Sequence, residues 1–161
     1  DCLEDPCNYA ARANMMWASS LAHNGLTECG RQFQLVVHQL EHEVSGMYPE
    51  VTHGAGLAAI WCSWARYVYE ANIPRWLQYA QNVWNLDIDF EHPEQTIEKA
   101  INMQEEYYAS MGMPTNLRSL GVEEDKLEKL ALDCSRNKTR TLIGYRPLAY
   151  EDVLEIFRMA Y

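Results

Sequence analysis

The residue types best suited to chemistry gather in one short segment, residues 38–56, with the sequence HQLEHEVSGMYPEVTHGAG. His38 and His42 are four residues apart, and His53 follows after a turn that contains a glycine and a proline. On a helix, side chains four residues apart project from the same face, so two imidazoles at this spacing can approach one ion. Sites for Zn²⁺ or Fe²⁺ combine imidazole and carboxylate ligands and keep at least one position open for chemistry. This segment is therefore a candidate metal site.

The same histidine spacing also occurs by chance on helices that bind no metal. Gln39, Leu40 and Glu41 stand between the first two histidines, so the H-E-x-x-H pattern of zinc proteases is absent. We interpret Glu41 and Glu43 as surface carboxylates or as outer carboxylates that support a ligand, rather than as primary ligands. The small residues 54–56 would let the backbone come close to a bound ligand. The spacing alone leaves the metal-binding and the purely structural interpretations open.

Helices must position these histidines, because apolar residues repeat with a helical period along nearly the whole chain. The sequence therefore predicts an all-α fold, with Thr141–Ile143 as a weak strand candidate. The five tryptophans fall within helical patterns and are expected in the core rather than at a cofactor site: they are Trp17, Trp61, Trp64, Trp76 and Trp84. The expected helices are Tyr9–His23, Arg31–Ser45 with Gly46 as its end, one that begins near Thr52, Arg75–Trp84, Pro93–Met111, Glu123–Cys134 and Tyr150–Tyr161.

Length and composition exclude several classes of protein. A chain of 161 residues is one domain's worth, so we expect a single helical domain over residues 1–161. The 23 acidic and 13 basic residues give a net charge of −10, which argues against a nucleic-acid partner. No apolar run approaches the ~20 residues of a membrane-spanning helix, so no membrane partner is expected. Five scattered cysteines without a C-x-x-C pair favour a reducing, cytoplasmic location.

Five segments, in order, resemble the C-terminal half of iron-containing alcohol dehydrogenases, in particular their butanol dehydrogenase and aldehyde reductase branch. The resemblance runs from about Asp5 to Tyr161, and its most specific part is the three-histidine segment. The five segments are NYAARANMMWASSLAHNGL, HQLEHEVSGMYPEVTHGAGLA, LQYAQNVWNL, YYASMGMPTNLRSLGV and YEDVLEIFRMA. The resemblance implies a multi-helical domain of the dehydroquinate synthase-like fold, which holds a catalytic metal against an N-terminal α/β domain that binds NAD(P)H.

The resemblance also implies a role for each histidine. His38 and His53 correspond to metal ligands, and His42 corresponds to a catalytic residue near the nicotinamide and substrate that does not bind the metal. The remaining ligands, an Asp and a His four residues apart, and the nucleotide-binding domain are expected to precede Asp1. The interval from His42 to His53 is one residue longer than the family's common spacing. We expect the turn at residues 48–50 to absorb the extra residue.

The resemblance implies an NAD(P)H-dependent enzyme that interconverts primary alcohols and aldehydes, with Fe²⁺, Zn²⁺ or Ni²⁺ as its divalent metal and with homodimers as its assembly. The 161-residue chain alone is expected to be inactive and not to bind NAD(P)H. One alternative is a stand-alone helical binding or interaction module without catalysis. Such a module would need polar side chains where the cofactor domain normally packs, and missing cover there should appear as an exposed apolar patch and self-association. Another is a related enzyme that acts on glycerol, lactaldehyde or another small hydroxyl compound.

Overall fold

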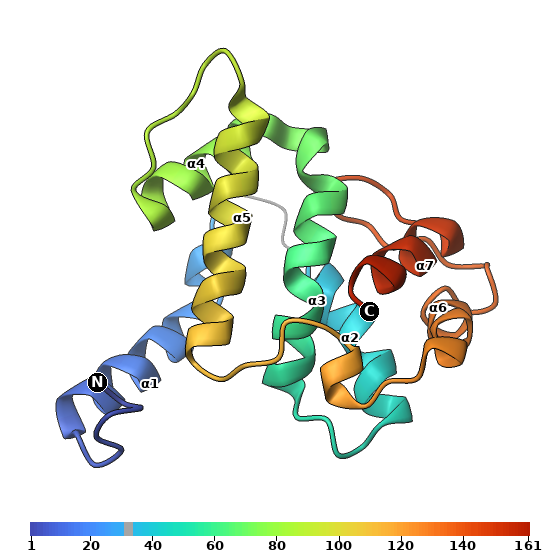
Figure 1. The fold of residues 1–161 in the computed structure, drawn as a ribbon, viewed down its shortest axis with the longest axis horizontal. Coiled ribbons are helices and arrows are strands. Elements are labelled where there is room, and N and C mark those ends of the chain that lie inside the picture. Colours follow the sequence, from blue (N-terminus) through green and yellow to red (C-terminus); the bar gives the residue numbers. More distant parts are fainter. Residues whose placement is uncertain (31–33) are drawn as a thin grey trace. The chain divides into compact units, whose positions relative to one another are not determined.

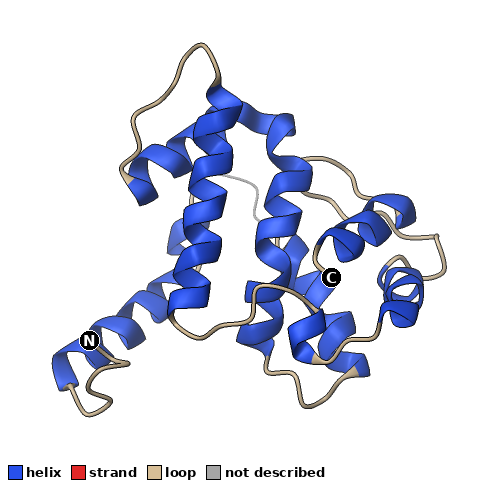
Figure 2. Ribbon diagram, viewed as in Figure 1, coloured by secondary structure: helices blue, strands red, loops and turns tan. Residues whose placement is uncertain are grey.

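The computed structural model describes residues 1–30 and 34–161, and its elements are helices joined by loops (Figures 1 and 2). Within these ranges no strand forms; Leu142 and Leu148 make a single antiparallel bridge, so the weak strand candidate is wrong. The all-α prediction is confirmed. The α-helices are α1 Tyr9–His23, α2 Val36–Met47, α3 His53–Val68, α4 Ile73–Trp84, α5 Pro93–Ser110, α6 Leu127–Cys134 and α7 Tyr150–Met159. The short 3₁₀ turns are Leu26–Glu28, Tyr69–Asn72, Arg118–Leu120 and Glu124–Lys126.

The second helix differs from its predicted bounds at both ends. Of the predicted start, residues 31–33 lie outside the described residues, and α2 begins at Val36. Gly46 does not end the helix, which continues through it to Met47. The helix stops at Tyr48 because the next residue is Pro49, whose ring disfavours helical backbone in the residue before it.

The chain divides into two compact units, Asp1–Gln34 and Leu35–Tyr161. The first unit contains α1, none of whose residues is buried. Trp17 is 65% exposed there, so its prediction as a core residue is wrong. The helical pattern was correct, but helical periodicity does not show whether a partner covers the apolar face. Of the other tryptophans, Trp76 is buried, whereas Trp61, Trp64 and Trp84 are half-buried.

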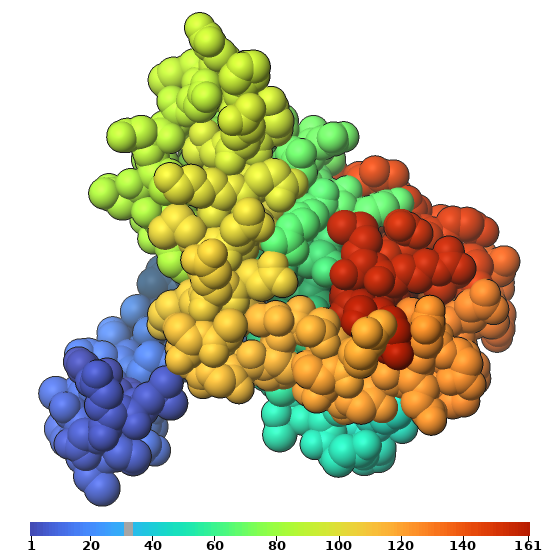
Figure 3. All heavy atoms as spheres, in the orientation of Figure 1, coloured from blue at the N-terminus to red at the C-terminus, as the bar shows by residue number. Residues whose placement is uncertain are grey.

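The second unit is built around α3, which packs against α2, α5 and α7. Its core contains fully buried residues from α2, α3, α5, α6 and α7, among them Leu40, Ile60, Ile101, Leu130 and Phe157. In addition, α4 packs against α5, and α6 packs against α7. Figure 3 shows α7 (red) and the segment around α6 (orange) as one continuous surface. This packing fixes α2 and α3 relative to each other.

The turn between α2 and α3 is short and internally hydrogen-bonded. The Tyr48 N–H donates to the Val44 carbonyl (2.8 Å), and the Val51 N–H donates to the Tyr48 carbonyl (2.9 Å). This turn leads directly into His53, the first residue of α3. None of the helices in the described ranges is long and apolar enough to cross a membrane.

Candidate metal centre

The structure brings the three predicted histidines together. His38 and His42 lie one turn apart on α2, and His53 begins α3. The centroids of the His38 and His53 rings are 5.0 Å apart, those of His42 and His53 5.4 Å, and those of His38 and His42 6.4 Å. The helical period accounts for the first pair of neighbours on α2. The packing of α3 against α2 adds the third ring.

This cluster has the dimensions of a metal site. Two imidazoles with centroids 5.0 Å apart can share an ion at metal–nitrogen distances of about 2.1 Å. His42 and His53 are exposed, and His38 is half-buried, so the cluster opens to the surface of its unit. An open position of this kind is what a catalytic metal needs, since substrate must also reach the ion.

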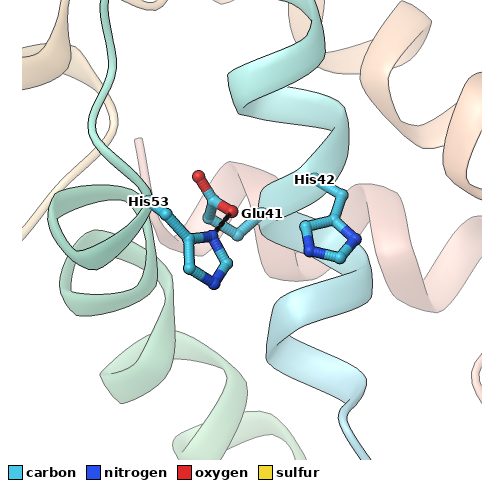
Figure 4. A group of neighbouring side chains, drawn as sticks. All are labelled: Glu41, His42 and His53. Atoms are coloured by element: carbon cyan, nitrogen blue, oxygen red, sulfur yellow. Dashed lines mark hydrogen bonds and ion pairs between the residues drawn. The ribbon is translucent and has the colours of Figure 1, made fainter.

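Glu41, the residue before His42 on α2, is fully buried. Its Oε2 contacts Nδ1 of His53, and the Ser45 hydroxyl donates a hydrogen bond to its Oε1. Figure 4 shows the dashed contact between Glu41 on α2 and His53 at the start of α3, with His42 beside them. Of the two interpretations of Glu41, a surface carboxylate is therefore wrong, and an outer carboxylate that supports a ligand stays a prediction.

A signal for the burial of Glu41 was present in the sequence. Val37, Glu41 and Val44 follow a spacing of four and then three residues, so Glu41 lies on the apolar stripe of α2. Both valines are buried, as is Glu41 between them. A carboxylate on an apolar stripe requires a polar partner, because burial without one is costly. The partner, His53, comes from another helix.

A second set of ligand atoms is also close together. One ligand atom from each of Glu41, His42 and His53 can be chosen so that all three lie within 4.8 Å of one another. The geometry therefore offers two ways to combine side chains around an ion, one with His38 and one with Glu41.

Glu43 has a different environment from Glu41. It is half-buried on α2, and burial raises the pKa of its carboxyl, with the negative charge of Asp133 raising it further. The positive charge of Arg140 acts in the opposite direction. Asp133 lies on α6, and Arg140 lies in the segment that follows it. Glu43 is not one of the candidate ligand groups that lie together among the described residues.

The family of the chain follows from comparison with known proteins. A family model described as "Fe-containing alcohol dehydrogenase family, C-terminal" matches residues 1–161. The chain belongs to this family. It is 41% identical over 160 residues to NADH-dependent butanol dehydrogenase A of Clostridium acetobutylicum, a match over 99% of this chain and 41% of that protein. It is 30% identical over 128 residues to NADPH-dependent aldehyde reductase YqhD of Escherichia coli, covering 80% of this chain and 32% of the reductase.

The fold agrees with this assignment. The crystal structure of NADH-dependent butanol dehydrogenase A from Thermotoga maritima is 29% identical and superposes with a TM-score of 0.91, over 99% of this chain and 41% of that one. The chain thus spans about two fifths of the length of these relatives, 41% and 40% for the two Clostridium acetobutylicum dehydrogenases. The predicted membership of the iron-containing alcohol dehydrogenases and the predicted helical C-terminal fold are confirmed.

Proposed function

We propose that this chain is the metal-binding catalytic domain of an alcohol dehydrogenase that interconverts primary alcohols and aldehydes with NAD(P)H. The observation that carries the proposal is the convergence of His38, His42 and His53, with ring centroids 5.0–6.4 Å apart, in a member of the iron-containing family. The names of the similar butanol dehydrogenases favour a primary alcohol such as butanol as the substrate class.

In this proposal His38 and His53 bind a divalent metal, with Fe²⁺ favoured by the family and Zn²⁺ or Ni²⁺ compatible with imidazole ligands. Two imidazoles are half of a tetrahedral ligand set. The remaining ligands and the nicotinamide cofactor are proposed to come from outside these 161 residues, the cofactor being bound by a nucleotide-binding domain. The 161-residue chain alone should therefore bind metal weakly and should not oxidise NAD(P)H.

When bound, the metal would supply Lewis acidity at the substrate oxygen, which favours loss of the alcohol proton or polarises the aldehyde carbonyl. His42 is proposed to handle the proton. Its ring is exposed and lies 5.4 Å from that of His53, so it borders the metal site without being enclosed by protein. A neutral imidazole accepts a proton at one nitrogen and donates one from the other, which suits exchange between the substrate oxygen and solvent.

The ligand assignment is tested by metal titration of the 161-residue chain with Co²⁺, followed by visible absorption, and with Zn²⁺ in competition with a chelator. Loss of a residue that only supports a ligand lowers metal affinity about 10–100-fold. Loss of a ligand itself should cost more, so His38→Ala and His53→Ala should each lower metal affinity about 100-fold or more. His92→Ala is the matched control, since His92 is an exposed histidine that pairs with Glu94. Equal affinities of His38→Ala and the unsubstituted chain would contradict the assignment.

The activity is tested in the complete enzyme. His38→Ala should abolish metal-dependent turnover of butanol or butanal, and His42→Ala should lower turnover while leaving metal content unchanged. Full activity of metal-stripped His38→Ala protein would refute the metal mechanism. Aldehyde-dependent consumption of NADH or NADPH by the 161-residue chain would show that the cofactor site lies within it.

A further inference from the structure

Glu41 is a buried acidic group to which the mechanism above gives no role. It is 0% exposed, and each of its carboxylate oxygens has one partner, Oε1 the Ser45 hydroxyl and Oε2 the Nδ1 atom of His53. A buried carboxylate is tolerated when its oxygens are hydrogen-bonded. Ser45 lies on α2, as Glu41 does, and His53 is the first residue of α3. The contact with His53 therefore joins the two helices at the point where the histidines meet (Figure 4).

The contact with Glu41 determines which nitrogen of His53 is available. The carboxylate occupies the Nδ1 side of the ring, and with an ionised carboxylate, which accepts hydrogen bonds and cannot donate one, Nδ1 of His53 is the donor in this contact. In a neutral ring the lone pair is then on Nε2, on the side of the ring away from Glu41 (Figure 4). A metal binds a lone pair, and ligating histidines are commonly oriented by a carboxylate at their other nitrogen.

Gly56 makes this contact sterically feasible. A Cβ atom at position 56 would lie 2.6 Å from both Cγ and Oε1 of Glu41, and 3.0 Å from Cδ. Both carboxylate oxygens of Glu41 have partners, so a shift away from such a Cβ would disturb the contacts with Ser45 and His53. Glycine destabilises a helix interior relative to alanine, yet glycine occupies position 56 of α3, one turn after His53. Gly46, near the end of α2, has no atom within 4 Å of such a Cβ.

We infer that Glu41 is a positioning residue that holds His53 in the Nδ1–H tautomer with Nε2 directed to the metal, and that Gly56 provides the space for it. This inference rests on the proposed role of His53 as a metal ligand. The rival role for Glu41 is direct coordination together with His42 and His53. The geometry favours positioning, since both carboxylate oxygens already have protein partners and Glu41 is fully buried, while His42 and His53 are exposed.

The first experiment measures the tautomer of His53 in the metal-free 161-residue chain, using long-range ¹H–¹⁵N correlation spectra. The unsubstituted chain should show protonated Nδ1 and unprotonated Nε2 at a pH where the ring is neutral. Glu41→Gln should keep this tautomer, because the amide oxygen still accepts a hydrogen bond. Glu41→Met removes the acceptor and should shift His53 towards a mixture. Gly56→Ala should do the same by displacing Glu41, and Gly46→Ala is the matched control that should change nothing.

The second experiment measures Co²⁺ and Zn²⁺ affinity of the same variants. Glu41→Met and Gly56→Ala should each weaken binding about 10–100-fold, the range typical for loss of an outer carboxylate. Glu41→Gln should retain most of the affinity and the same Co²⁺ absorption spectrum, and Gly46→Ala should match the unsubstituted chain. Far-UV circular dichroism identifies any variant that fails to fold. If Glu41→Met fails to fold, Gly56→Ala and Glu41→Gln still test the inference.

The outcomes separate this inference from the proposed function. An unchanged His53 tautomer in folded Glu41→Met and Gly56→Ala would overturn the positioning role. A Co²⁺ spectrum altered by Glu41→Gln would also overturn it, in favour of direct coordination. If instead the tautomer shifts as expected but His53→Ala binds metal normally, the proposed ligand role fails while the Glu41–His53 geometry stands.

Discussion

Burial separates the five cysteines into two groups with different chemistry. Cys62 on α3 is 2% exposed and Cys134 on α6 is fully buried, and all five cysteines are free thiols. The Cys62 thiol donates to the Ile101 carbonyl, and the Cys134 thiol donates to the Gln39 carbonyl. Burial raises the pKa of each thiol to about 12. A thiol with so high a pKa is almost entirely protonated at neutral pH and is therefore a poor nucleophile.

Thiol labelling with an Ellman-type reagent at pH 8 should accordingly detect three reactive cysteines in the native chain and five in denaturant. The reactive three are Cys2, Cys7 and Cys29, which are exposed or half-buried. Rapid reaction of Cys62 or Cys134 in the native chain would contradict the burial.

The same pKa values give a sign for the alkaline pH dependence of stability. In the unfolded chain the thiols of Cys62 and Cys134 ionise near their ordinary value of 9.0, and in the native chain near 12. Between these values the unfolded state loses protons first, so the free energy of unfolding should fall as the pH rises from about 9 to 12. Replacing both cysteines with alanine should flatten this part of the profile, as measured by urea unfolding at several pH values.

At the level of the helices, the N-termini of α3 and α4 are capped differently. The Asn72 side chain accepts a hydrogen bond from the Arg75 N–H (3.2 Å) at the start of α4. Thr52 stands at the cap position of α3, as the sequence predicted, but its hydroxyl makes no capping hydrogen bond. The start of α3, where His53 lies, is thus held by the contact with Glu41 on α2 rather than by its own cap.

The two caps should therefore respond differently to truncation. Asn72→Ala should lower the free energy of unfolding by about 1 kcal/mol, since it leaves a backbone N–H at the start of α4 without its acceptor. Thr52→Ala, the matched control, should change it by no more than about 0.5 kcal/mol, in the range of surface substitutions. Urea unfolding measures both. A larger loss for Thr52→Ala than for Asn72→Ala would contradict the capping pattern.

At the level of the whole molecule, the apolar core belongs to one of the two units. Every buried apolar residue among those described lies between Val36 and Ala160, within the unit Leu35–Tyr161. The unit Asp1–Gln34 contributes α1, a helix of 15 residues without a buried side chain. Helices of this length are marginally stable in water without tertiary packing. The cooperative unfolding of the chain should therefore reflect residues 35–161.

A chain that starts at residue 35 tests this. It should unfold cooperatively, with a midpoint within a few degrees of the 161-residue chain, as measured by circular dichroism at 222 nm. Within it, Phe157→Ala should cost about 3–5 kcal/mol, because Phe157 is fully buried in the core. Loss of the cooperative transition on removal of residues 1–34 would show that the two units are energetically coupled.

Local patterns in the sequence were sufficient for the helices and for two of the three histidines in the cluster. Seven helices were predicted near their observed positions because apolar periodicity and stop signals are local properties of the chain. The proximity of His38 and His42 follows from the helical period alone. Membership of the iron-containing alcohol dehydrogenases was also determined by residue patterns, and the fold agrees with it.

The tertiary structure decided what depends on contacts between segments distant in the sequence. The packing of α3 on α2 places His53 5.0 Å from His38 and closes Glu41 from solvent, and neither distance nor burial follows from spacing along one helix. The same holds for Trp17, which has a helical pattern like that of buried Trp76 but lies exposed on α1. Helical periodicity reports which face of a helix is apolar, whereas its burial depends on a partner that local sequence does not specify.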